Sequence, residues 1–249
     1  MIKLKCVSTG SKGNCYFFQD DDRYLCLDCG SHIKWNEVLK GCDFQTGCVD
    51  GLILSHIHAD HLPKVSKFHN LGIPVIGNEE TKQYVRETQN TYVYAISEMK
   101  KFKLDLWEII PWYVPHTGND GIPCKCYAYY IKSPSGHKLV YITDFLYSPI
   151  RFGKMNVNSI LVAANHDDDI DGGDNESKFR HVIMGHSSLS TVKELIKVNQ
   201  TDSLRNVILC HLSSENATPI KMQSEVQEVV GNSVTVNIAQ DGHEYILER

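Results

Sequence analysis

The segment Ser55-His56-Ile57-His58-Ala59-Asp60-His61 directly follows residues 51–54, an apolar run that predicts a buried strand. It brings three imidazoles and one carboxylate together on a short loop. Nitrogen and oxygen donors in this mixture suit zinc, and they also suit manganese or iron. A surface cluster of polar side chains at a strand end is the alternative. One loop cannot surround an ion tetrahedrally, so a metal site here needs ligands from other parts of the chain.

Residues of the same kind stand at the ends of three other predicted strands. Three apolar runs are followed by His116, Asp144 and His211. A lone histidine at a strand end is more often structural than a ligand. Because the ends of several strands gather at one edge of a sheet, these residues and the 55–61 loop together favour a dinuclear metal centre.

Strand-like runs and helical spacings alternate along the whole chain. Helices are expected at residues 62–69 and 79–88, from a capping box of Thr191 with Glu194, and from Thr218-Pro219 to residue 230. No repeat or linker interrupts this order, so residues 1–249 are expected to form one α/β domain. Strands are expected at residues 3–8, 15–18, 24–28, 51–54, 107–114, 126–132, 138–143, 160–164, 206–210, 234–238 and 244–247.

Composition narrows the class of protein. With 42% hydrophobic residues among 249, the chain can bury a sizeable core. No apolar run is long enough to span a membrane, and the first residues lack a signal-peptide pattern. We therefore expect a cytoplasmic protein without a membrane partner, whose nine cysteines are reduced. The formal net charge of −5 argues against a protein that grips long stretches of nucleic acid.

Two cysteine pairs resemble halves of a zinc knuckle. Cys26 and Cys29 flank Asp28 in a strand-like run, and Cys124 and Cys126 have the wrong spacing for such a site. We therefore interpret all four as buried thiols.

This pattern resembles the metallo-β-lactamase fold superfamily over nearly the whole chain. The resemblance implies a four-layer αββα sandwich and a metal-dependent hydrolase. It is carried by the HxHxDH loop together with Asp28, His116, Asp144 and His211.

Four further segments resemble a narrower bacterial and phage branch of phosphodiesterases. They are residues 8–14, 164–167, 185–188 and 211–216. This branch holds relatives of tRNA 3′ processing enzymes and the phage anti-Pycsar proteins, which hydrolyse cyclic nucleotide messengers. The resemblance implies hydrolysis of 3′,5′-cyclic mononucleotides to nucleoside monophosphates, by a phage protein that evades antiviral signalling in the host cytoplasm.

The family pattern assigns roles to individual residues. It implies two divalent ions, zinc being favoured and manganese compatible, which share Asp144 and generate a nucleophile from water. Asp60 and His186 are the expected catalytic residues. His186 would protonate the leaving oxygen or hold a phosphate oxygen, and a buried structural histidine is its alternative. The remaining first-site ligands are His56, His58 and His116, and the second-site ligands are Asp60, His61 and His211.

Three residues are expected to support this centre. Asp28 would accept an imidazole N–H from a ligand and so fix its tautomer. Ser11 and Asn14 lie in a glycine-rich segment that can offer backbone N–H groups to a phosphate, or simply form a tight turn.

Other functions stay open on the sequence alone. A nuclease for single-stranded DNA or RNA would use the same chemistry. The net charge of −5 on this chain does not exclude a local basic strip that binds nucleic acid. Glyoxalase-like thioesterases and sulfur dioxygenases share the HxHxDH loop, although the narrower segments point away from them. A non-catalytic scaffold is the remaining alternative, and the full ligand set argues against it.

The family also implies a homodimer in which the neighbouring chain helps to cover the site. The expected interface lies in residues 81–103 or 117–125, the longest segments without a ligand or a strong strand signal. The first segment carries Tyr84, Tyr92 and Tyr94, residues of a type enriched in interfaces. The alternative is that these tyrosines fill the core of the monomer.

Overall fold

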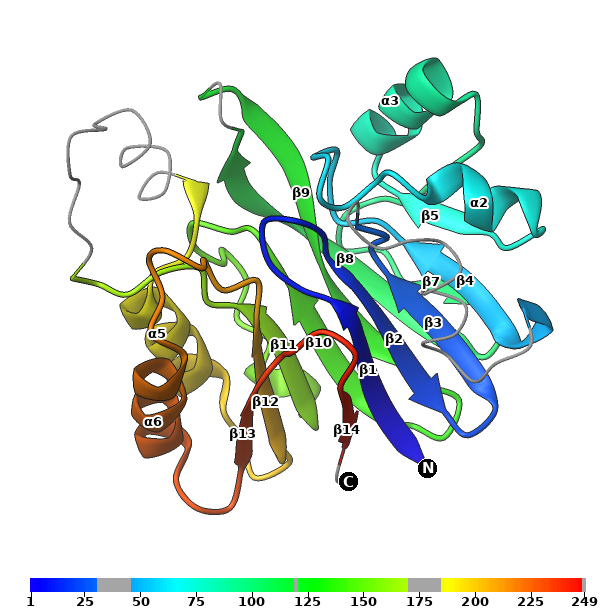
Figure 1. The fold of residues 1–249 in the computed structure, drawn as a ribbon. Coiled ribbons are helices and arrows are strands. Elements are labelled where there is room, and N and C mark those ends of the chain that lie inside the picture. Colours follow the sequence, from blue (N-terminus) through cyan, green and yellow to red (C-terminus); the bar gives the residue numbers. More distant parts are fainter. Residues whose placement is uncertain (31–45, 119–120, 170–184, 248–249) are drawn as a thin grey trace.

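The computed structural model describes residues 1–30, 46–118, 121–169 and 185–247. In these residues the chain forms two seven-stranded mixed sheets that pack face to face (Figure 1). The first sheet has the strand order β14-β1-β2-β3-β4-β5-β6, and the second has the order β13-β12-β11-β10-β9-β8-β7.

The first sheet is antiparallel from β14 to β3 and parallel from β3 to β6. The loop of residues 55–61, which carries four of the expected metal ligands, follows β4 in the parallel part. The strands are β1 (Ile2–Ser8), β2 (Cys15–Asp20), β3 (Arg23–Leu27), β4 (Val49–Ile53), β5 (Val75–Gly77), β6 (Tyr94–Ala95) and β14 (Glu244–Ile246).

The second sheet is antiparallel from β7 to β10 and parallel from β10 to β13. β11 and β12 are buried along their whole length, which explains why both read as continuous apolar runs instead of alternating patterns. The strands are β7 (Phe102–Leu104), β8 (Trp107–Thr117), β9 (Pro123–Lys132), β10 (Lys138–Ile142), β11 (Ser159–Ala163), β12 (Asn206–Cys210) and β13 (Thr235–Ile238).

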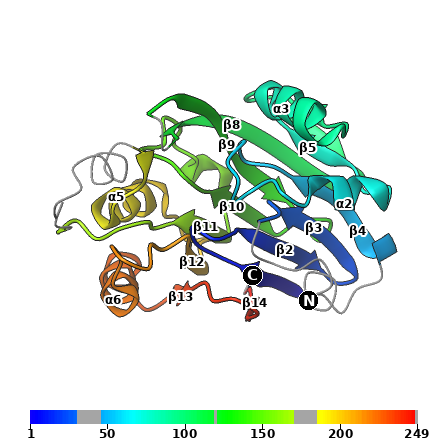
Figure 2. The ribbon, with the colours of Figure 1, turned by 45° about the horizontal axis from the view of Figure 1, so that its top comes forward.

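Helices cover the outer faces of both sheets. Figures 1 and 2 show α2 (Val65–Asn70) and α3 (Glu79–Gln89) beside the first sheet, and α5 (Leu189–Asn199) and α6 (Pro219–Val230) beside the second. Two 3₁₀ turns, η1 (Thr46–Cys48) and η2 (Gly153–Met155), complete the described elements. None of the described helices has the length and apolar composition to cross a membrane.

Two hydrophobic clusters follow from this layering. The larger one fills the space between the sheets and continues under α5 and α6. The smaller one lies between the first sheet and α2 and α3, where Phe17 packs against Phe68. Because apolar faces of both sheets and of the four described helices are buried in this way, the expected αββα sandwich is confirmed.

Several boundaries differ from those expected from the sequence. α5 begins three residues earlier than the predicted capping box, because the Ser188 side chain accepts the Thr191 N–H as N-cap. α2 is limited to Val65–Asn70, since the preceding residues form the ligand loop. β8 continues to Thr117, so His116 lies inside a strand and not after one. The short strands β5, β6 and β7 were not predicted at all.

Candidate metal centre

The structure brings all seven predicted ligands together at one edge of the two sheets. The loop after β4 supplies four of them, and β8 and the ends of β10 and β12 supply the others. They fall into two groups, and within each group the ligand atoms lie within 4.8 Å of one another. The first group is His56, His58, His116 and Cys124, and the second is Asp60, His61, Asp144 and His211.

The first group converges through its ring nitrogens. His58 Nδ1 lies 3.0 Å from His56 Nε2 and 3.0 Å from His116 Nε2. His116 donates its Nδ1–H to the Gly185 carbonyl at 2.6 Å, so in the neutral ring Nε2 carries the free lone pair. The Nδ1 atom of His56 is likewise hydrogen-bonded to the Ser55 hydroxyl, at 2.9 Å. His58 Nδ1 can donate at most one N–H, so it cannot bond to both neighbouring Nε2 atoms. A metal ion that accepts the lone pairs of all three nitrogens fits this arrangement.

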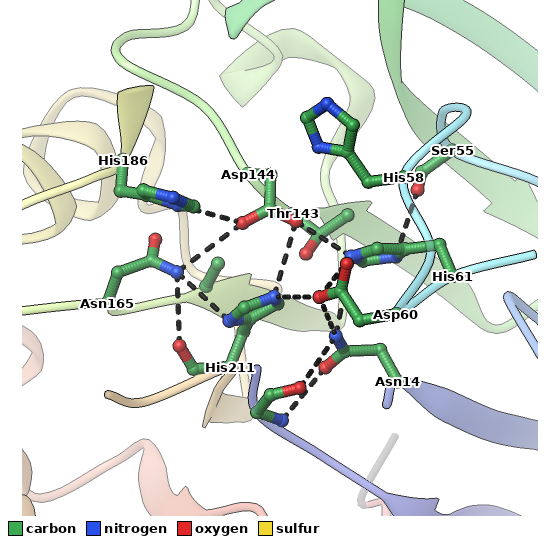
Figure 3. A network of polar contacts seen from close by, with 12 residues as sticks. Asn14, Ser55, His58, Asp60, His61, Thr143, Asp144, Asn165, His186 and His211 are labelled. Atoms are coloured by element: carbon green, nitrogen blue, oxygen red, sulfur yellow. Dashed lines mark hydrogen bonds and ion pairs between the residues drawn. The ribbon is translucent and has the colours of Figure 1, made fainter. Parts of the chain in front are cut away.

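The second group pairs imidazoles with carboxylates. His61 Nε2 lies 2.8 Å from Asp144 Oδ2, and His211 Nε2 lies 3.0 Å from Asp60 Oδ2. Asp144 Oδ2 also lies 3.7 Å from His56 Nε2 of the first group. One carboxylate oxygen therefore faces ligand atoms of both groups, as a bridging ligand must. Figure 3 shows Asp144 in the middle of these contacts, with His186 on one side and His61 on the other.

The two groups differ in electrostatics. Burial lowers the pKa of His56 and His58 and lowers that of His116 to about 3, so the environment of these three imidazoles disfavours their charged forms. In the second group burial opposes the charged form, but Asp144 and Asp60 together raise the pKa of His211 to about 10. Those carboxylates attract positive charge, which a divalent ion supplies when it displaces the imidazole protons. Both donor sets therefore suit divalent metal ions.

Asp28 connects the two groups from behind. Its Oδ2 accepts the His61 Nδ1–H at 2.7 Å and the Ser55 hydroxyl at 2.6 Å. Because the Ser55 proton goes to Asp28, the Ser55 oxygen accepts the Nδ1–H of His56. Asp28 thus sets the tautomer of one ligand in each group, with Nε2 left free for a metal. Tyr141 donates a further hydrogen bond to Asp28 Oδ2 at 2.6 Å.

The glycine-rich turn after β1 supports the site through a side chain. Asn14 Nδ2 donates to Asp60 Oδ2 at 3.1 Å, and its Oδ1 accepts from the Gly10 N–H. The backbone N–H groups of Gly13 and Asn14 bond to Gly10 and Asp60 carbonyls within the protein. These two backbone donors are therefore occupied within the protein, and Ser11 is exposed in this turn.

His186 lies at the open side of the centre. Its Nδ1 is 3.0 Å from Asp144 Oδ1, and its side chain keeps 17% of its surface exposed. Its ring centroid is 5.1 Å from that of His116 and 6.1 Å from that of His211, so it lies beside both groups. His186 is therefore partly buried, and its role stays a prediction.

Sequence reasoning missed several supporting residues. Asn165, directly beyond β11, places Nδ2 3.4 Å from Asp144 Oδ1 and 3.1 Å from the His211 carbonyl. The strand-end rule that found Asp144 would have found Asn165 as well. Ser55 and Tyr141 were given no supporting role. Ser55 meets Asp28 across the neighbouring ends of β4 and β3, whereas the contact of Tyr141 with Asp28 depends on the packing of one sheet against the other. Cys124 was interpreted as a buried thiol, whereas the structure groups it with three ligand histidines.

Known structures allow the fold to be placed. No family model and no curated protein matches the sequence. YhfI from Bacillus subtilis, a metallo-beta-lactamase fold protein, is 21% identical, with 98% of both chains covered and a TM-score of 0.75. A diphosphatase from the PhnP family is 15% identical, covering 98% of this chain and 96% of its own at a TM-score of 0.68. Unliganded yeast PDE1 is 12% identical, with 98% of both chains covered and a TM-score of 0.68. The chain therefore has the metallo-β-lactamase fold, as its ligand pattern predicts.

Replacing Asp28 tests how the two groups are connected. Asp28→Asn keeps the shape but offers an N–H group where donors from Ser55, His61 and Tyr141 now converge. We expect the affinity for metal to fall about 10–100-fold at both sites, as loss of an orienting carboxylate does. Titration against a chelator of known affinity measures both binding steps.

Asp22→Asn is the matched control, because Asp22 is exposed in the turn between β2 and β3. Wild-type affinity at both sites in Asp28→Asn, with the fold intact, would show that Asp28 does not orient the ligands.

Proposed function

We propose that this protein is a dinuclear metallohydrolase of phosphodiesters that opens 3′,5′-cyclic mononucleotides. The observation that carries the proposal is the pair of donor groups that share one carboxylate, with Asp144 Oδ2 2.8 Å from His61 Nε2 and 3.7 Å from His56 Nε2. Such a pair is typical of sites that clamp both the attacking and the leaving oxygen of a phosphoryl group.

Two divalent ions are the cofactors of this proposal. His56, His58 and His116 would hold one ion, Asp60, His61 and His211 the other, and Asp144 would contact both. Bound there, the ions supply an activated nucleophile from water at neutral pH and neutralise charge on the phosphate. Three imidazoles in one group favour zinc, and the two carboxylates of the other group are compatible with manganese.

The protein's own groups prepare the site for this chemistry. Asp28 keeps His56 and His61 in one tautomer, so that no reorganisation is needed when a substrate arrives. Asn14 holds Asp60, and Asn165 holds Asp144, in fixed orientations. His186, partly exposed beside Asp144, is placed to donate a proton or a hydrogen bond to the oxygen that leaves phosphorus.

A small substrate fits the charge of the molecule better than a long one. A cyclic mononucleotide carries one negative charge, which the ions can neutralise without a basic groove. A nucleic acid would need many phosphate contacts, and the chain carries a formal net charge of −5. The similarity in fold to a diphosphatase and to PDE1 is compatible with a phosphate ester or anhydride as substrate. The proposed place of action is the cytoplasm.

A substrate panel tests the proposal. The metal-loaded protein is incubated with 3′,5′-cyclic mononucleotides of all four bases, in parallel with Asp60→Ala. We expect linear monophosphates from at least one of them and background rates from the variant, because Asp60 is a ligand of the second ion. Product is measured by ion-exchange chromatography.

If no cyclic mononucleotide reacts faster than with Asp60→Ala, the substrate proposal is wrong. Cleavage of single-stranded oligonucleotides that falls steeply with added salt would support the nuclease instead, since phosphate contacts release counterions.

His186→Ala separates metal binding from chemistry. His186 lies outside both donor groups, so two ions per chain should remain bound. If His186 assists the leaving oxygen, turnover of a cyclic nucleotide should fall by about 10²–10⁴-fold. Turnover of bis(p-nitrophenyl) phosphate, whose leaving group needs no proton, should fall much less. Equal losses on both substrates would indicate that His186 positions the phosphate, and unchanged rates would remove it from the mechanism.

We further propose that two copies of the chain form a C₂ dimer in which one covers the site of the other. Tyr84, Tyr92 and Tyr94 keep 41%, 54% and 51% of their surface exposed, so they do not fill the core of the monomer. Tyr92 and Tyr94 pack edge to face with ring centroids 4.8 Å apart, beside β6 at the edge of the first sheet. Exposed aromatic residues at a sheet edge are suited to an interface.

Light scattering at assay concentration tests the dimer. We expect about twice the chain mass of 28.2 kDa, and a shift towards the monomer when Tyr92 and Tyr94 are both replaced by serine. Ile246→Ser is the control, because Ile246 is 65% exposed on β14 at the opposite edge of the same sheet. A fully active wild-type protein with the mass of one chain would contradict the shared site.

A further inference from the structure

Cys124 lies among the donor atoms of the first group. It belongs to β9, is 6% exposed, and its sulfur lies within 4.8 Å of the ligand nitrogens of His56, His58 and His116. Among the described cysteines, it is the one that joins such a donor group. Thiolate sulfur, like imidazole nitrogen, is a common ligand of zinc in proteins.

Strand pairing explains why the sulfur is there. Cys124 stands directly opposite His116 in the antiparallel pairing of β8 with β9. Residues opposite one another project to the same face of a sheet, with their Cβ atoms about 4.5–5.5 Å apart. The position of Cys124 is therefore fixed by the same two strands that position His116, and not by a mobile loop.

A second cysteine on the same strand face serves as an internal comparison. Cys126 is two residues along β9 from Cys124, and its Sγ lies 3.8 Å from His56 Nδ1 and 3.5 Å from the Thr143 carbonyl. The other nitrogen of His56, Nε2, faces His58. Cys126 thus lies behind the histidine ring, while Cys124 lies with the ligand atoms.

We propose that Cys124 is a further protein ligand of the ion held by His56, His58 and His116, beside the shared Asp144. The proposal rests on the dinuclear centre described under the proposed function. It makes the two sites chemically different. Beside the shared Asp144, one site offers three imidazoles and a thiolate, and the other offers two imidazoles and the carboxylate of Asp60. Soft thiolate selects zinc, whereas carboxylates accept manganese. The first site is therefore a dedicated zinc site, and the second is permissive.

Cobalt(II) reports directly on sulfur ligation. The protein is loaded with Co²⁺ in a buffer whose reductant contains no thiol, and absorption is recorded in the visible and near-ultraviolet. We expect visible ligand-field bands together with an intense near-ultraviolet band from thiolate-to-cobalt charge transfer. Cys124→Ser should abolish the near-ultraviolet band and keep the visible bands, because the histidines remain. Cys126→Ala should keep both.

The readouts separate this inference from the proposed function. Visible bands without a near-ultraviolet band in the wild-type protein, or a band that survives Cys124→Ser, overturn the role of Cys124 and leave the dinuclear centre standing. No cobalt bands at all overturn the metal centre and this inference together. Neither outcome depends on which substrate the protein hydrolyses.

Competition between zinc and manganese gives a second measurement. Wild-type protein equilibrated with both ions should retain one zinc per chain, as measured by elemental analysis after desalting. Cys124→Ser should lower the preference of that site for zinc over manganese at least about tenfold. Loss of a group that only orients a ligand already weakens metal binding about 10–100-fold, and loss of a ligand should have no smaller effect. An unchanged preference in a folded variant overturns the proposal. Circular dichroism confirms that each variant keeps its fold.

Discussion

The carboxylate of Asp28 is the constraint on which the rest of the site depends. It is fully buried, and three side chains donate hydrogen bonds to it: His61 and Ser55 from the loop after β4, and Tyr141 from β10 of the opposite sheet. A buried carboxylate is stable only when such donors surround it. The same hydrogen bonds that satisfy Asp28 fix the faces that His56 and His61 present to a metal. The hydrogen bonds to Asp28 therefore both satisfy a buried charge and orient the histidines of the site.

The sequence predicts most of this arrangement, for a physical reason. Buried parallel strands read as apolar runs, and polar residues at their ends mark one edge of a sheet, so Asp144 and His211 could be assigned without coordinates. Properties that depend on pairing between distant segments could not be predicted from the sequence. The opposition of Cys124 and His116 follows from the register of β8 with β9, and the donation by Tyr141 follows from sheet packing. The cap at Ser188 was missed because Thr191 and Glu194 mimic a capping box three residues later.

Backbone conformation adds a second constraint at the same residues. Asp28, Asp144 and His211 all have φ in the left-handed region, at 55°, 40° and 52°. Residues other than glycine adopt this region at a cost, and such residues gather at functional sites where the surrounding structure holds them in place. Each of the three directly follows or nearly follows a strand, where the chain must turn sharply to point a side chain back across the sheet edge. The geometry of the centre is thus imposed by the framework.

The pairing of β1 with β14 has a consequence for the way the molecule is made. β14 lies near the end of the chain, yet it completes the sheet that begins with the first residues, next to the turn that holds Asn14 against Asp60. Contacts between segments so distant in sequence form slowly, because a long loop must close before they are gained. A growing chain on the ribosome carries the HxHxDH loop long before His211 and β14 exist. Its histidines are then present without the residues that complete the two donor groups, so these groups can assemble only after His211 has been made.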